Sequence, residues 1–213
     1  MGDMAMWQMA LRSFSMWILI ITSIISLTFF IERWLHFSRL KHLEHDDFMR
    51  KIKDHIQKGS IDLAIKDCRQ VNHPLCRVVE VGLKNFQYAR EEIYELITGQ
   101  ISKEQLGLEK NLGVLGTISN IAPMLGLFGT ISGIIRAFRD IGMTGSGGSS
   151  VIAIGVSEAL VATAFGILIA VVATIFYNYF SRRVAIVLTQ LEVIRQELLV
   201  WLRKHDELSG SFK

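Results

Sequence analysis

One carboxylate stands well inside the long apolar stretches of this 213-residue sequence, and it is the first candidate for chemistry. Glu158 lies about two helical turns into the last stretch, roughly 10 Å at 1.5 Å per residue. If that stretch crosses a membrane, a charge there costs at least ~2.5 kcal/mol, so the side chain should face a cavity, form an ion pair or conduct ions. Two interpretations stay open, because Glu158 could line a pore or could pair with Arg136 or Arg139 near the membrane surface.

Small and hydroxyl-bearing residues recur at helical spacing in two of the apolar stretches. They let helices approach closely in lipid, and their hydroxyl and amide groups must find partners there. Each threonine could therefore line an ion pathway, or it could serve packing alone and bond to its own helix. The candidates are Asn120, Pro123, Gly126, Thr130 and Gly133 in one stretch, and Thr163, Gly166 and Thr174 in the other.

No arrangement of residues indicates an enzyme, a cofactor site or a metal site. The glycines around Gly126 are followed by no Gly-Lys-Ser/Thr, so they are not a phosphate loop, and no serine-centred elbow is present. Cys68 and Cys76 enclose His73, but this spacing is not that of a zinc site. We expect both cysteines inside the cell, where a disulfide is disfavoured. The sequence therefore predicts a protein that is not an enzyme.

Three apolar stretches must position these side chains. No charged residue occurs at 13–31 or at 111–135, and 141–181 contains Glu158 alone. A helix needs about 20 apolar residues to cross the hydrocarbon core, and none of the three stretches shows the polar face of a soluble helix. We therefore expect transmembrane helices at 13–31, 111–137 and 151–181, the first of them bulky and facing lipid.

The basic residues indicate how these spans are oriented. Thirteen Lys and Arg lie between Ser38 and Lys110 and six follow Ser181, whereas one precedes Ser13 and the Gly/Ser-rich loop at 141–150 has none. Because Lys and Arg are retained inside, we expect a periplasmic N-terminus and a cytoplasmic C-terminus. The thirteen basic residues are interleaved with twelve acidic ones, which argues against nucleic-acid binding.

The segments outside the spans follow from helical periodicity. Residues 1–12 are expected to form an amphipathic periplasmic segment, and 138–150 a periplasmic loop. Residues 32–110 are expected to form a helical cytoplasmic domain, with turns at Gly59 and near Pro74 and with a longer helix from Arg90 that continues into the second span. An apolar stripe at 182–203 predicts that the last span and the C-terminal segment 182–213 form one long helix.

One carboxylate is too few for a relay across about 30 Å of membrane. Either several copies of the chain enclose a shared pathway, or a second protein supplies the group that carries the ion.

The second and third spans resemble the MotA/TolQ/ExbB proton channel family. Residues 119–133 (SNIAPMLGLFGTISG) are similar to the family pattern N-x-A-P-x-x-G-L-x-G-T-V-x-G, and residues 156–166 (VSEALVATAFG) to I-x-E-A-L-x-A-T-A-x-G, followed by Tyr177 and Asn178. The two motifs occur in the family's order, and the three-span layout resembles the ExbB/TolQ branch. Val172 is a departure, since the family usually has a proline there.

The resemblance implies a function and partners. It implies an all-α homo-oligomer, a pentamer, around a dimeric single-span partner of the ExbD/TolR type, which brings an ion-carrying Asp. Thr130 and Thr163 correspond to the family's pore threonines, and Glu158 to its glutamate. The expected function is a proton channel in a bacterial inner-membrane motor that energises TonB- or TolA-dependent processes. Two alternatives are a stator of a flagellar or gliding motor and a passive membrane scaffold.

Overall fold

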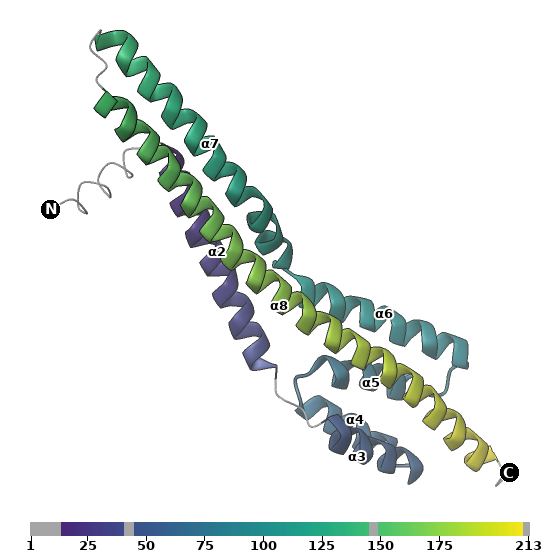
Figure 1. Cartoon of the computed structure of the whole chain (residues 1–213). Coiled ribbons are helices and arrows are strands. Elements are labelled where there is room, and N and C mark those ends of the chain that lie inside the picture. Colours follow the sequence, from purple (N-terminus) through teal and green to yellow (C-terminus); the bar gives the residue numbers. More distant parts are fainter. Residues whose placement is uncertain (1–13, 41–44, 145–148, 211–213) are drawn as a thin grey trace. The chain divides into compact units, whose positions relative to one another are not determined.

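The computed structural model describes residues 14–40, 45–144 and 149–210, and these residues form helices joined by short turns (Figure 1). The expected all-α class is confirmed, whereas the segment 1–12 lies outside the described residues. The helices are α2 (Phe14–Arg39), α3 (His45–Gln57), α4 (Ile61–Gln70), α5 (Pro74–Lys84), α6 (Arg90–Glu109), α7 (Leu112–Thr144) and α8 (Ser149–Gly210).

Three of these helices, α2, α7 and α8, are long and apolar enough to cross a membrane. Each of them extends beyond the span that the sequence predicted. Helix α2 continues past residue 31 to Arg39, and α7 continues to Thr144, so residues 138–144 are helical where a loop was expected. Helix α8 runs without interruption to Gly210, which confirms that the last span and the following segment are one helix.

The expected continuation of the helix from Arg90 into the second span is wrong. Helix α6 ends at Glu109, Lys110 has extended backbone angles, and α7 begins at Leu112. Between them Asn111 has a φ of 63°, in the left-handed region that side-chain-bearing residues seldom adopt. Two residues, Lys110 and Asn111, therefore separate the two helices.

The chain divides into two compact units. The span unit contains the described residues up to Trp34 together with Asn111–Phe180, and the head unit contains Leu35–Lys110 with the residues from Ser181 onward. The boundary falls inside α2 and α8, so each of these helices contributes to both units.

The head unit has its own apolar core. The predicted stripe on α8 is buried in it through Val184, Leu191, Ile194, Leu198 and Leu202, and helices α3–α6 supply the rest. The predicted turns occur where expected, with Gly59 in a left-handed conformation between α3 and α4, and with Pro74 in the first turn of α5. Burial of this stripe explains why a domain of some seventy loop residues needs the C-terminal helix.

An ion pair between α5 and α6 accompanies this core. Arg77 donates from Nε to Glu104 Oε1 at 2.7 Å and from Nη2 to Glu104 Oε2 at 2.5 Å, and Gln100 donates to the same carboxylate at 2.7 Å. The Glu104 side chain is 9% exposed, and its hydrogen bonds raise the pKa of Arg77 above the ordinary value. The bidentate geometry fixes the two helices against each other more specifically than a single contact would.

Both cysteines are free and lie in the head-unit core. Burial raises the pKa of Cys68 far above its ordinary value and that of Cys76 to about 11, although the neighbouring Arg77 lowers the latter. The two thiols therefore stay protonated at neutral pH and behave as small apolar side chains.

Candidate ion pathway

Helices α7 and α8 pack with their backbones unusually close, through the small residues noted in the sequence. A methyl group added at Gly126 would lie 3.0 Å from the Cα of Thr163, and one added at Gly166 would lie 2.6 Å from the carbonyl oxygen of Ala122. One added at Gly133 would lie 2.9 Å from the Cβ of Ala159. These three glycines therefore lie between the helices, where any larger side chain would push them apart.

Thr163 joins the two helices by a hydrogen bond. Its Oγ1 donates to the carbonyl oxygen of Gly126 at 3.1 Å, across the contact where the missing Gly126 side chain allows the approach. The hydroxyl oxygen keeps its lone pairs, so the group can still accept a proton or contact a cation. Thr163 is partly exposed, which leaves this oxygen at the edge of the helix pair.

Thr130, Thr174 and Asn120 each donate to a carbonyl of their own helix. The distances are 2.6 Å from Thr130 to Leu127, 2.7 Å from Thr174 to Ala170 and 3.0 Å from Asn120 to Gly116. Asn120 and Thr174 are exposed and Thr130 is partly exposed. Their acceptor oxygens therefore face outward from the helix pair.

Pro123 adds an acceptor of a different kind to α7. It stands inside the helix and has no N–H, so it cannot donate to the carbonyl of Ser119 four residues earlier. Ser119 is half-buried, and its own hydroxyl donates to the Gly116 carbonyl at 2.7 Å. The backbone of α7 thus offers a carbonyl that lacks its helical hydrogen bond within the span.

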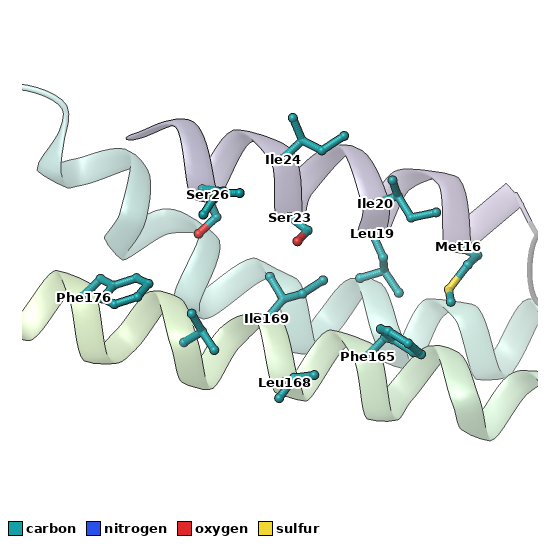
Figure 2. A pocket seen from close by; sticks show the side chains of 12 residues that line it. Met16, Leu19, Ile20, Ser23, Ile24, Ser26, Phe165, Leu168, Ile169 and Phe176 are labelled. Carbon is teal, nitrogen blue, oxygen red and sulfur yellow. The ribbon is translucent and has the colours of Figure 1, made fainter. Parts of the chain in front are cut away.

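Two grooves show which side of the α7–α8 pair α2 occupies. One groove, of about 390 Å³, lies between α2 and α8, where Leu19 and Ile169 point into it (Figure 2). A second groove, of about 560 Å³, lies between α2 and α7 and includes Leu125. In addition, the Oγ of Ser15 would lie 3.1 Å from a methyl group added at Gly129. Helix α2 therefore covers one side of the α7–α8 pair.

The polar candidates of α7 lie on the opposite side. Successive helical residues are about 100° apart, so Pro123 and Thr130 lie about 140–160° around α7 from Leu125, which faces α2. The exposed Asn120 lies about 140° from Leu125 but only about 20° from Gly113, which also lines the second groove. On α8, Thr163 and Thr174 lie about 160–180° from Val172, which lines the first groove. We call these five residues the hydroxyl face.

Glu158 does not belong to the hydroxyl face. It lies about 40° around α8 from Val172 and about 140° from Thr163, and it therefore points toward the side of α2. Its Oε1 is 3.8 Å from Nη2 of Arg136, and its side chain is 18% exposed. That oxygen is buried and has no hydrogen-bond partner among the described residues. Of the two interpretations left open, the single chain shows the ion pair with Arg136.

Sequence analysis assigned no role to a second polar group, which is formed by Glu32, Arg33 and Asn111. Asn111 donates to Glu32 at 2.8 Å, Arg33 donates to the same carboxylate at 2.6 Å, and the Arg33 side chain is 3% exposed. An arginine just after an apolar stretch is typical of a membrane flank, so its burial had no distinct signal. Ser15, buried against α7, had none either.

The hydroxyl face can pass protons through ordered water or contact a small cation, but it holds no group that carries charge. Between 112 and 135 the chain has no carboxylate, and between 153 and 181 it has Glu158 alone. A face of hydroxyl, amide and carbonyl groups in lipid must be covered by protein or must border water. The arrangement therefore suits one wall of a pathway whose other wall comes from another chain.

Comparisons with known proteins match the part of the chain that contains the hydroxyl face. The model of the MotA/TolQ/ExbB proton channel family matches residues 70–193. The biopolymer transport protein ExbB of Neisseria gonorrhoeae is 30% identical over 71% of this chain and 76% of its own length. The Tol-Pal system protein TolQ of Pseudomonas aeruginosa is 36% identical over 50% of this chain and 51% of its own length.

A third relative aligns with a larger share of this chain. An ExbB homologue of Methanothermobacter thermautotrophicus is 25% identical over 78% of this chain, and the alignment spans 59% of that relative. The family model covers more than half of the present sequence and includes α7 with most of the membrane part of α8. The chain therefore belongs to the MotA/TolQ/ExbB proton channel family, in its ExbB/TolQ branch.

Proposed function

We propose that this chain is the channel-forming subunit of an inner-membrane motor of the ExbB/TolQ type, driven by proton flow. The hydroxyl face carries the proposal, because four polar residues of α7 and α8, together with Pro123, lie on the side that α2 leaves open. Such a face is unfavourable toward lipid and favourable toward a hydrated pathway. Thr130 and Thr163 line the pathway, and the proton carrier comes from elsewhere.

A single-span partner of the ExbD/TolR type supplies that carrier, an Asp that takes up and releases the proton. Several copies of the chain, five by the family resemblance, surround the partner with their hydroxyl faces turned inward. Relative motion of the partner then energises an outer-membrane process through a TonB- or TolA-like protein. The N-terminus is periplasmic and the C-terminus cytoplasmic, as the distribution of basic residues indicates.

Glu158 has a supporting role in this proposal. Its ion pair with Arg136 ties the ends of α7 and α8 that lie toward the loop between them, and this holds the hydroxyl face in register. Protons that enter from that side pass the ion pair, so the charge of Glu158 also affects the local electrostatic potential. A passive scaffold would need the glycine packing of α7 and α8, but it would not need exposed hydroxyl groups on the opposite side.

The decisive variant is Thr163→Val, which keeps the shape of the side chain and removes its hydroxyl. In vesicles that contain this chain and its single-span partner, we expect proton flux to fall by about ten-fold or more, since one essential hydroxyl is lost. A pH-sensitive dye inside the vesicles measures the flux. The matched control is Thr117→Val, because Thr117 bonds to Gly113 at 2.8 Å in its own helix and lines the groove toward α2.

The comparison of the two variants tests the proposal directly. Loss of flux in Thr163→Val with retention in Thr117→Val supports a pathway along the hydroxyl face. Equal proton flux in both variants and in the unaltered chain would mean that the hydroxyl face serves only helix packing, as in a scaffold. Replacing the proton gradient with a sodium gradient tests the choice of ion, and we expect no flux from sodium.

A further inference from the structure

The break between α6 and α7 contains two non-helical residues, Lys110 and Asn111, and Asn111 has the less common conformation. Asn111 has a φ of 63° and stands between Lys110 and Leu112, where one helix ends and the next begins. Residues with a Cβ avoid this region, and asparagine tolerates it better than most because its short polar side chain can form local hydrogen bonds. A contact that holds Asn111 there is expected, because the left-handed conformation is unfavourable for a residue with a Cβ.

Glu32 of α2 provides the holding contact. Its Oε2 accepts a hydrogen bond from Nδ2 of Asn111 at 2.8 Å, so the side chain that follows α6 is tied to a different helix, 79 positions earlier in the sequence. The contact lies inside the span unit, at one end of the groove between α2 and α7. Through it, the first residue before α7 is fixed relative to α2.

Arg33 fixes Glu32 in turn. Its Nη2 donates to Glu32 Oε1 at 2.6 Å, while its side chain is 3% exposed and that of Glu32 is 42% exposed. A buried guanidinium group needs a nearby carboxylate, so the pair restricts Glu32 to a narrow range of positions. Both carboxylate oxygens are thus engaged, one by the buried arginine and the other by Asn111.

The consequence concerns the direction in which α7 points its polar residues. Asn120 and Thr130 follow Asn111 by nine and nineteen residues in one continuous helix. A change of one residue in the start of α7 would rotate the whole helix face by about 100° relative to what precedes it. The conformation of Asn111 therefore affects the direction in which the polar side of α7 points relative to α2.

We propose that Glu32, Arg33 and Asn111 form a latch that fixes the rotational setting of α7 against α2. Glu32 and Asn111 are positioning residues, and neither lies on the hydroxyl face. The effect of the latch on proton flow rests on the proposed function, whereas its effect on the setting of α7 does not. All three residues of the latch lie inside the span unit, with Asn111 directly before α7.

The test measures the setting of α7 without any ion flux. Spin labels are attached at Ile31→Cys on α2 and Gly113→Cys on α7, because Ile31 is 47% exposed and a side chain at Gly113 meets nothing within 4 Å. The native Cys68 and Cys76 are buried and protonated, so they react little with the label. Pulsed electron paramagnetic resonance gives the distance distribution between the labels, and hydrogen exchange reports on the first turn of α7.

The informative variants are Glu32→Gln, Asn111→Gly and Asn111→Ala. Asn111→Gly permits the left-handed conformation but removes the tie to Glu32, and Glu32→Gln leaves a single acceptor oxygen for two donors. In both we expect the distance distribution to widen about two-fold and exchange in the first turn of α7 to rise about ten-fold. The control is Asn120→Ala, whose lost amide bonded to its own helix, and it should leave both measurements unchanged.

Non-additivity separates a latch from three independent stabilising residues. The double variant Glu32→Gln with Asn111→Gly should widen the distribution no more than either single variant, because both remove one contact. Unchanged distances and exchange in Glu32→Gln and Asn111→Gly would overturn the latch, and these two variants remain informative if Asn111→Ala does not fold. The latch variants should also lower proton flux, whereas Thr163→Val should lower flux with unchanged distances, so the two proposals fail independently.

Discussion

The contact between Glu158 and Arg136 allows two interpretations, an ion pair that stabilises the helices or a carboxylate that takes part in the ion pathway. The carboxylate oxygen nearest to Arg136 is 3.8 Å from it, too far for a hydrogen bond and close enough for an ion pair. It is also buried without a hydrogen-bond partner among the described side chains, which carries a desolvation cost. Arg136 partly offsets that cost, and it is itself 40% exposed.

These two residues give a prediction about stability. Arg136→Gln should lower the free energy of unfolding by about 1–3 kcal/mol, because it leaves a buried carboxylate without its counter-charge. Thermal unfolding in detergent micelles measures the change. Adding Glu158→Gln should restore most of the loss, since the orphaned charge is then removed as well.

The same variants distinguish the two roles of Glu158. If the residue acts through the ion pair, Glu158→Gln alone should lower flux and stability together. A loss of flux in Glu158→Gln with unchanged stability would instead place the carboxylate in the pathway. Such a result would contradict its assignment to the side of α2.

At the residue scale, the sequence located the polar candidates but not their neighbours. The isolation of Glu158 in an apolar stretch was visible, as was the choice between pore and ion pair. What selected Arg136 over Arg139 was the helical phase of two separate helices, which the sequence of either helix does not contain. The group around the buried Arg33 was hidden for the same reason, because Asn111, which shares the Glu32 carboxylate with Arg33, is 79 positions from Glu32.

At the scale of elements, the close contact of α7 and α8 makes a sharp prediction. Gly166→Ala places a methyl group 2.6 Å from the backbone carbonyl of Ala122, which cannot move without shifting α7. We expect the two helices to separate locally, with a loss of about 1–3 kcal/mol of stability by overpacking. Circular dichroism during heating in micelles checks the value.

Gly113→Ala is the matched control for Gly166→Ala. Its added methyl group meets nothing within 4 Å, and alanine favours a helix over glycine by about 1 kcal/mol. The two variants should therefore move the unfolding temperature in opposite directions. Equal effects would show that helix propensity, and not contact between helices, determines stability at these glycines.

The helices themselves were largely predictable, and their ends were less so. The three spans and the long C-terminal helix followed from apolar length and periodicity, which are properties of each segment alone. The break at Asn111 was missed because helical periodicity continues on both sides of it, from Ile101 and Leu108 to Leu112 and Leu115. Its cause is a tertiary contact with Glu32, and such contacts are absent from a local pattern.

At the scale of the whole molecule, two surfaces of the chain fit the proposed assembly with other chains. In the span unit the hydroxyl face needs cover. In the head unit the side of α8 opposite the core carries Ile186, Val193 and Val200, which are 46%, 45% and 53% exposed. These residues are seven positions apart, so they form a continuous apolar seam along the helix, as in helices that pack against another helix.

This seam makes the assembly of several copies testable in the head unit, away from the proposed pathway. Val193→Lys places a charge in the middle of the seam, and burying that charge against a neighbouring copy would be costly. We expect the assembly in mild detergent to shift toward single chains, as measured by native mass spectrometry. Val193→Leu keeps the apolar character and should keep the assembly.

A control at another exposed apolar residue completes this test. Leu63 on α4 is 51% exposed, so Leu63→Lys makes a similar chemical change outside the seam and should leave the measured mass unchanged. If Val193→Lys assembles like the unaltered chain, the seam is not the contact between copies. If the complex of the unaltered chain with its partner contains only one copy of this chain, no second hydroxyl face is available to form the other wall of the pathway. The pathway would then have to run between this chain and the partner alone.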